Sequence, residues 1–194
     1  MLDRSIPYYN IIMRCDCFAP LPETARGITV RNYQPGDEKQ WAEIEYSIGD
    51  FASVDEAEQY FKTHYTDEIF DRCFFAEDKN KNVIGTCIAW YDLKDGKFVS
   101  SLHWLAVAPK YQNNGVGKTL LNAVMNYYCQ NHLMPVYLHT QPWSYKAIKL
   151  YLSAGFKIIK TDTFVDYTNE YSEAISVLKN YLTTISKISN FKSY

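Results

Sequence analysis

Apolar and polar positions change their spacing several times in the first third of the chain. Residues 27–33 predict a β-strand, which the Pro-Gly-Asp run at 35–37 ends. A helical spacing follows to about Ile48, and a capping box at Ser53 and Glu56 predicts the start of a second helix. The side chains that we expect to face the core are Trp41, Ile44 and Ile48 in the first helix and Ala57, Tyr60 and Phe61 in the second.

The middle of the chain predicts an antiparallel series of strands, followed by a strand–helix–strand crossover. Strands are expected at 72–77, 83–92 and 98–108, because the turn-forming stretches DKNKN and KDGK separate them. The later elements are a helix over 115–131, a strand over 135–140, a helix over 144–153 that Gly155 ends, and a strand over 156–161 with a partner at 163–167. This order predicts a mixed α/β fold with a mostly antiparallel twisted sheet and helices on both faces.

The two ends of the chain differ from this central domain, which we place at 27–168. Three prolines, Pro7, Pro20 and Pro22, oppose regular structure, so residues 1–26 are expected to be an irregular extension. The stretch 169–194 predicts an amphipathic helix that packs on the domain or covers a partner subunit. Its apolar positions at helical spacing are Ala174, Ile175, Leu178, Leu182 and Ile185.

Composition and charge exclude several classes of protein. The net charge is −2 and no basic stripe is present, so a nucleic-acid partner is not expected. No apolar run reaches the length of a membrane span, and the first residues lack the pattern of a secretory signal. Five cysteines, an odd number without the spacing of a disulfide framework, indicate reduced thiols and a cytoplasmic protein. Cys15 and Cys17 alone are too few ligands for zinc, so we expect no metal.

The most informative segment is the glycine-containing loop that precedes the helix at 115–131. Gly115 and Gly117 allow positive φ angles and remove side chains, so that backbone N–H groups can point into one concavity at a helix N-terminus. Such a loop suits a pyrophosphate. The run Gly117-Lys118-Thr119 also matches the end of an ATP- or GTP-binding P-loop, but Gln112 stands where that motif needs glycine. A plain turn before a helix is the remaining interpretation.

Two motifs at a fitting separation distinguish these interpretations. Residues 112–117, QNNGVG, resemble the Gln/Arg-x-x-Gly-x-Gly/Ala motif of the GNAT superfamily of N-acetyltransferases, and the preceding LAVAP is also similar. Residues 144–156, SYKAIKLYLSAGF, resemble its second motif, although Ser144 replaces the usual Asn. The resemblance covers roughly 27–165. It implies a GNAT-like fold that takes acetyl-coenzyme A as co-substrate into the gap between two splayed strands, 98–108 and 135–140.

The resemblance also implies which residues contact that co-substrate. Val107 would offer backbone groups to the pantetheine arm. The amides of Gln112, Asn114, Gly115, Gly117 and Lys118 would hold the pyrophosphate. The complete set that we expect at the cofactor is Leu105, Val107, Gln112, Asn113, Asn114, Gly115, Val116, Gly117, Lys118, Ser144, Ala147 and Tyr151. Serine can still cap the helix that begins near position 144.

Amide formation needs a proton acceptor for the amine and a proton donor for the leaving thiolate. Tyr151 matches the tyrosine of the second motif, and a phenol is protonated at neutral pH, so it is the expected acid; a core tyrosine is the alternative. His103 is the candidate base, because related arylalkylamine acetyltransferases carry a histidine there and imidazole titrates near neutrality. It could instead be a structural histidine. Strand alternation places His103 on the same face as Leu105 and Val107, unless a bulge in the strand breaks the alternation. The weaker alternatives for the base are Asp92, Glu45, Glu56 and water.

The sequence therefore predicts an N-acetyltransferase that moves the acetyl group of acetyl-coenzyme A directly to a primary amine of a small molecule or peptide. A catalytically silent sensor that only binds coenzyme A is the alternative from another class. No nucleic-acid or membrane partner is expected, and the resemblance allows a homodimer. The acceptor itself cannot be read from the motifs.

Overall fold

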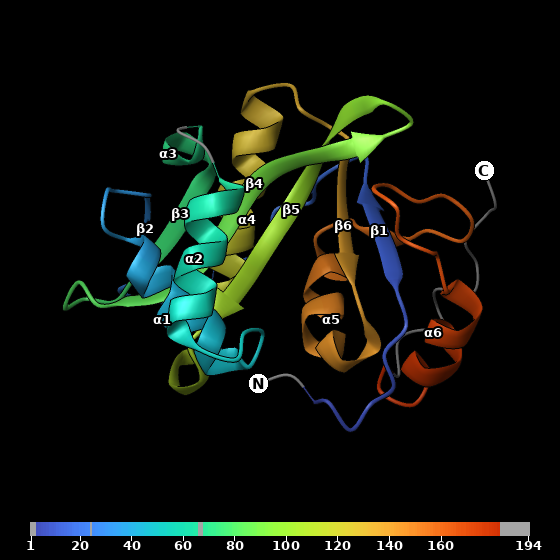
Figure 1. Ribbon diagram of the computed structural model, residues 1–194, viewed down its shortest axis with the longest axis horizontal. Coiled ribbons are helices and arrows are strands. Elements are labelled where there is room, and N and C mark those ends of the chain that lie inside the picture. The colour runs from blue at the N-terminus through green and yellow to red at the C-terminus, as the bar shows by residue number, and fades with distance from the viewer. Residues whose placement is uncertain (1–2, 24, 66–67, 183–194) are drawn as a thin grey trace.

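The chain folds around one twisted sheet with helices on both faces (Figure 1). The computed structural model describes residues 3–23, 25–65 and 68–182. Within these ranges the strand order is β2-β3-β4-β5-β6-β1-β7, and the pairs are antiparallel except β5 with β6. The strands are β1 Ile11–Cys15, β2 Thr29–Asn32, β3 Cys73–Glu77, β4 Val83–Lys94, β5 Lys97–Val107, β6 Val136–Thr140 and β7 Lys157–Ile158.

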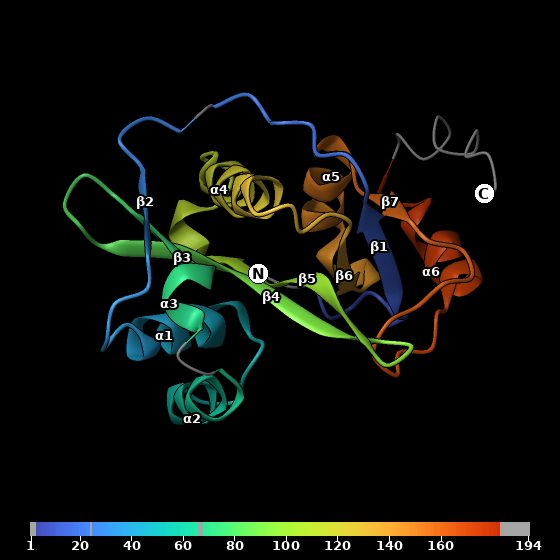
Figure 2. The same ribbon diagram turned by 90° about the horizontal axis from the view of Figure 1, so that it is seen from above.

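The helices separate into two layers (Figure 2). The first three cover one face around a core that includes Trp41 and Phe61, while α4 and α5 cover the other face around Leu121 and Tyr151. The helices are α1 Glu38–Ile48, α2 Val54–His64, α3 Ile69–Arg72, α4 Val116–Gln130, α5 Tyr145–Ser153 and α6 Tyr171–Leu178, with short 3-10 turns at Pro109–Tyr111 and Pro142–Ser144. The predicted mixed fold is confirmed. Among the described residues, no helix is both long and apolar enough to cross a membrane.

The capping signals read from the sequence form as expected. Ser53 Oγ accepts a hydrogen bond from the N–H of Glu56 at the start of α2. The Glu56 carboxylate in turn accepts from the N–H of Ala52. At the end of α5, Gly155 has a φ of +100°, and a Cβ there would come within 2.5 Å of the Cys17 carbonyl oxygen. Glycine therefore fits this position for two reasons, its left-handed backbone and the close approach of another segment.

Residues 1–26 are not irregular throughout, which corrects the prediction. They contain β1, which lies inside the sheet between β6 and β7. Ile11, Ile12 and Met13 are all fully buried, so both faces of β1 are covered and its sequence does not show the alternation that marks a half-buried strand. The three prolines flank this strand rather than interrupt it.

The C-terminal region also differs from the prediction. The strand expected over 156–161 shortens to β7, and 163–167 forms no strand in the described structure. Phe164 instead packs with Ile12 and Tyr137, and the Thr163 hydroxyl donates to the carbonyl of Tyr167 at 2.8 Å. The helix expected over 169–194 is described as α6, and Ile185 lies outside the described residues. The short α3 was not predicted.

Two irregularities in β5 shape the site. The parallel pairing of β5 with β6 is limited to Ser100 with Val136 and Ser101 with Tyr137, after which the strands diverge as predicted (Figure 1). A register shift then leaves two residues of β5, Trp104 and Leu105, opposite one residue of β4. Trp104 has a φ of 50°. This β-bulge turns Trp104 to the same face as the preceding His103, toward α2, where their rings contact Tyr60 and Tyr65 respectively.

Candidate functional site

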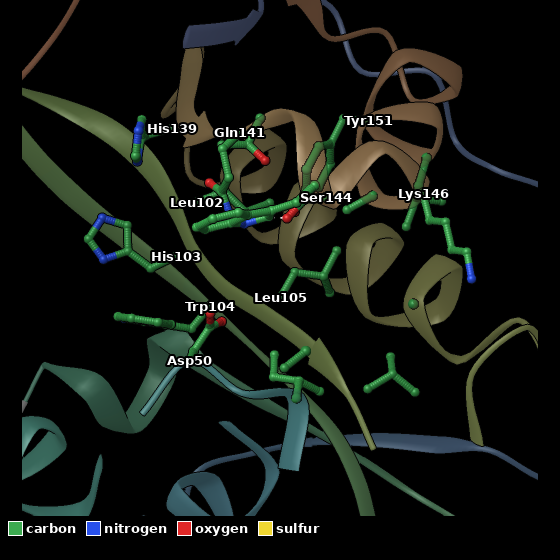
Figure 3. Close-up of a pocket in the computed structure, with 18 of the residues that line it drawn as sticks. Asp50, Leu102, His103, Trp104, Leu105, His139, Gln141, Ser144, Lys146 and Tyr151 are labelled. Carbon is green, nitrogen blue, oxygen red and sulfur yellow. Dashed lines mark hydrogen bonds between the residues drawn. The ribbon is translucent and has the colours of Figure 1, made fainter. Parts of the chain in front are cut away.

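The splayed strands border one cavity of about 970 Å³. Figure 3 shows side chains that line it: Lys146 and Tyr151 lie toward one end, whereas His103 lies toward the other. Most of the residues predicted to contact the cofactor line this cavity together with His103: Leu105, Val107, Gln112, Asn113, Gly115, Gly117, Lys118, Ser144, Ala147 and Tyr151. Two of them do not line it. Val116 is buried in the core beneath α4, and Asn114 is exposed.

The loop before α4 presents a row of free backbone donors. Gly115 has a φ of +85° and Asn113 a φ of +64°, whereas Gly117 is in the first turn of α4 and does not use the positive φ that glycine allows. The N–H of Gln112 donates to Pro109 and that of Lys118 to Gly115. Within the described structure the N–H groups from Asn113 through Gly117 have no protein acceptor. Of the amides predicted to bind the pyrophosphate, those of Gln112 and Lys118 are thus already paired within the loop, and those of Asn114, Gly115 and Gly117 are not. The unpaired run lies at the positive end of α4.

Gly117 contributes by its small size. A Cβ atom at this position would lie 3.4 Å from Leu150 Cδ2 and 3.8 Å from Val107 Cγ2, which are ordinary contact distances. Gly117 therefore lines the cavity between Leu150 of α5 and Val107 of β5, and it has no side chain to cover its backbone there. Longer side chains here would project into the gap between the strands.

Two polar side chains in this region hydrogen-bond within the protein. The Gln112 side-chain amide donates to the carbonyl of Val107 at 2.9 Å and so ties the loop to the end of β5. Ser144 is the N-cap residue of α5, but its side chain makes no capping hydrogen bond; its hydroxyl accepts from the Gln141 amide at 3.1 Å. Lys118 and Lys146 add positive charge beside the loop. This end of the cavity can therefore bind an anionic group.

Tyr151 occupies the wall that α5 presents to the cavity. Its side chain is buried and its ring packs on Phe156 at 5.7 Å. Among the described residues the hydroxyl has no hydrogen-bond partner. Burial, and then the nearby Cys87 and Glu45, raise the pKa of Tyr151 above its usual value. The phenol therefore stays protonated at neutral pH and can donate a proton or a hydrogen bond.

His103 makes contacts through both ring nitrogens. Nε2 lies 2.7 Å from Asp92 Oδ2 and 3.1 Å from Ser101 Oγ, and Nδ1 lies 3.3 Å from the Tyr65 hydroxyl. Burial alone would raise the pKa of Asp92, but the hydrogen bond and charge of His103 outweigh it, so this pKa is lowered. Asp92 is thus an acceptor, Nε2 carries the proton, and Nδ1 accepts from Tyr65, whose pKa burial raises well above its usual value.

The far end of the cavity contains groups that sequence reasoning missed or treated as secondary. His139 was assigned a structural role, yet it lines the cavity, stacks on Tyr167 at 3.9 Å and approaches Asn10 Oδ1 at 2.8 Å. Burial, and then the charge of His103, lower the pKa of His139 to about 4. Tyr8 comes from the segment thought to be irregular. Tyr8 lies just before β1, whose place inside the sheet the sequence did not predict.

Carboxylates gather at the same end. Asp3, Glu45, Asp50 and Asp92 all line the cavity. Glu45 and Asp92 were considered only as weaker bases, and Glu56, also considered, caps α2 and does not line the cavity. The cavity therefore combines donors and lysines beside α4 with acidic groups beside α1 and β4. In the described part of the chain, no group of three or more His, Cys, Asp or Glu side chains is arranged to hold a metal ion.

The sequence matches a known family over most of its central part. The pattern of the acetyltransferase (GNAT) family covers residues 38–156. The spermidine N(1)-acetyltransferase of Vibrio cholerae is 31% identical over 109 residues, which are 55% of this chain and 60% of that protein. The chain thus aligns with less than two thirds of this relative's length.

Solved structures agree on the fold. A GCN5-related N-acetyltransferase from Sphaerobacter thermophilus superposes with a TM-score of 0.60 at 23% identity, over 78% of this chain and half of that one. A mutant of the Vibrio cholerae spermidine N-acetyltransferase superposes with a TM-score of 0.55 at 24% identity, over 73% of this chain and 87% of that one. At these identities the likeness concerns the fold.

Proposed function

Because the chain belongs to the GNAT acetyltransferase family, we propose that it transfers the acetyl group of acetyl-coenzyme A to a primary amine of a small molecule or peptide. One observation carries this proposal: a single cavity has unpaired N–H donors and lysines at one end and carboxylates at the other. An anionic acyl carrier and a cationic amine would meet between them. The spermidine-acetylating relative supports a small aliphatic amine as the acceptor.

The residues present fit the carrier. The N–H groups of Asn113 to Gly117 would bind the pyrophosphate, and Lys118 and Lys146 would add charge to that contact. The end of β5 at Val107 would line the pantetheine arm, opposite Ala147 on α5. Acetyl-coenzyme A supplies the acetyl thioester, and the chain binds it, orients it and moves the protons.

His103 and Tyr151 would divide the proton transfers. Nδ1 of His103 gives up its hydrogen bond with the Tyr65 hydroxyl and takes a proton from the acceptor ammonium. Asp92 then stabilises the resulting imidazolium through Nε2. The freed nitrogen lone pair attacks the carbonyl carbon and forms the C–N bond, the C–S bond breaks, and the new amide nitrogen releases its second proton to solvent. Tyr151 gives its proton to the departing sulfur, and solvent restores it. Direct attack requires both substrates to be bound together.

The test is turnover by the purified chain. Thiol release from acetyl-coenzyme A, with an acetylated product identified by mass, is expected for one or more primary amines in a panel. Intersecting initial-velocity patterns would support direct attack, and parallel lines would indicate a covalent acetyl-enzyme. Binding of acetyl-coenzyme A without thiol release for any amine would favour the silent sensor instead.

A further inference from the structure

Glu45 is a buried acid without a partner. The α1 helix places it on the inner face with Trp41 and Ile48, and it is 0% exposed. Neither carboxyl oxygen has a hydrogen-bond partner within the described residues, yet Glu45 lines the cavity. Burying an unpaired carboxyl is unfavourable, because the group loses water without gaining a donor. Glu45 is therefore suited to a donor that arrives with a ligand.

No cationic side chain of the described residues is hydrogen-bonded to Glu45. Burial, and then the negative charge of Asp50, raise its pKa well above the usual value. The other titratable groups that respond to its charge are Tyr65, Cys73, Cys87 and Tyr151, none of which is positive at neutral pH. The nearby Arg4 is directed to the following loop, where its guanidinium lies 3.7 Å from Asp50 and donates to the Gly49 carbonyl.

The wall beside Glu45 also suits a positive charge on an alkyl chain. Trp104, turned inward by the bulge, lines the cavity together with Tyr60, and their rings meet edge to face at 5.4 Å. Aromatic faces attract ammonium groups and pack well against methylene chains. Asp50 lines the cavity as well, and the ring of the next residue, Phe51, lies 5.3 Å from that of Trp104; Figure 3 labels both Asp50 and Trp104.

Glu45, on α1, and the proposed base His103, on β5, lie at different places along the cavity. The residues of α1 that flank Glu45, Ile44 and Ile48, pack on Ala106. His103 precedes Ala106 by three positions, and the bulge at Trp104 lies between them, so the two are separated by less than three residues of extended strand, which would span about 10 Å. Asp92 is already paired with His103, whereas Glu45 is unpaired. An acceptor with two positive groups would reach both positions.

We propose that Glu45 binds a second ammonium group of the acceptor, so that the preferred acceptor is an aliphatic diamine whose other amine is acetylated near His103. The proposal rests on the proposed function and names its substrate class. It assigns Glu45 to binding and specificity, with Trp104 and Tyr60 lining the path of the carbon chain.

The test compares putrescine with butylamine, which has the same carbon chain and one amine. In the wild type, kcat/KM should favour putrescine by about tenfold or more, since a charge-assisted hydrogen bond contributes on that order. In Glu45→Gln this ratio should fall by about tenfold. The matched control is Glu43→Gln, because Glu43 lies on the same helix but is exposed and outside this cavity. An unchanged ratio in Glu45→Gln would overturn the proposal.

A second measurement does not depend on turnover. Calorimetric titration of putrescine into the protein, without a thioester, should give binding that Glu45→Gln weakens by about tenfold. If the wild type and Glu45→Gln bind putrescine equally well, the Glu45 subsite is rejected, even if the protein acetylates amines. If putrescine binding depends on Glu45 but no amine gives thiol release, only the proposed function is rejected. Glu45→Leu provides the structural readout: it should raise Tm by removing an unpaired buried carboxyl, while putrescine binding is lost. A lower Tm with normal binding would show a purely structural role.

Discussion

Asp92 Oδ2 lies 2.7 Å from Nε2 of His103, so a carboxylate on β4 and an imidazole on β5 are paired across the long hairpin. The pairing holds one ring nitrogen as a donor and leaves the other as the acceptor. It therefore gives His103 the orientation that a base needs, by the same logic as a carboxylate behind a catalytic histidine.

Replacing the carboxylate should reveal this arrangement. Asp92→Asn is expected to lower kcat by about 10–100-fold, because the neutral amide no longer stabilises the imidazolium. The measurement is kcat across a pH series, alongside His103→Ala, which should lose the acidic limb of the profile. Asp95→Asn is the control, since Asp95 lies in the exposed hairpin turn. Wild-type turnover in Asp92→Asn would assign the proton transfer to another group.

The Tyr151 hydroxyl can be removed with little structural cost. Because it has no hydrogen-bond partner in the described structure, Tyr151→Phe should leave Tm unchanged. Its kcat should fall by about 10²-fold or more if the phenol protonates the thiolate, with the affinity for acetyl-coenzyme A retained. Tyr127→Phe, on α4 and outside the cavity, is the matched control. Undiminished turnover would leave Tyr151 as a core residue.

Gly117 allows a paired test of the loop. Gly117→Ala should fold normally, because its Cβ meets Leu150 and Val107 at ordinary distances and alanine favours a helix by up to about 1 kcal/mol. Gly117→Glu should reduce coenzyme A binding by about 100-fold or more, since a carboxylate would enter the anion site and repel the pyrophosphate. Calorimetry on both variants decides the matter, and normal affinity in Gly117→Glu would contradict the loop assignment.

His139 predicts a pH dependence of stability. Its folded pKa of about 4 lies below the usual value, so the unfolded chain binds a proton that the folded chain does not. The contribution of His139 to the free energy of unfolding should be fully present above a pH of about 6.5 and decrease as the pH falls toward about 4. At pH 5 the loss should reach up to about 2 kcal/mol. Urea unfolding of the wild type and His139→Asn at pH 7 and pH 5 checks this; equal losses in both would exclude His139 as the source.

Local signals in the sequence predicted much of the fold and the anion end of the site. The loop before α4 depends on glycine and on a helix start, both of which are visible in nearby residues. The opposite end depends on tertiary contacts. Glu45 follows Trp41 by four positions, so its inward face was predictable from helical spacing, but its lack of a partner was not. The direction in which His103 points depends on the bulge at Trp104. Trp104 has a left-handed φ, which tryptophan does not favour, so nothing in the sequence indicated the bulge.

The place of β1 inside the sheet has a consequence for how the molecule assembles. Arg14 pairs with Tyr137 although 123 positions separate them. During synthesis β1 therefore emerges long before its partner β6, and its apolar residues stay uncovered in the meantime. Such distant pairing delays folding, and a nascent chain shorter than β6 would be vulnerable to aggregation or to binding by chaperones.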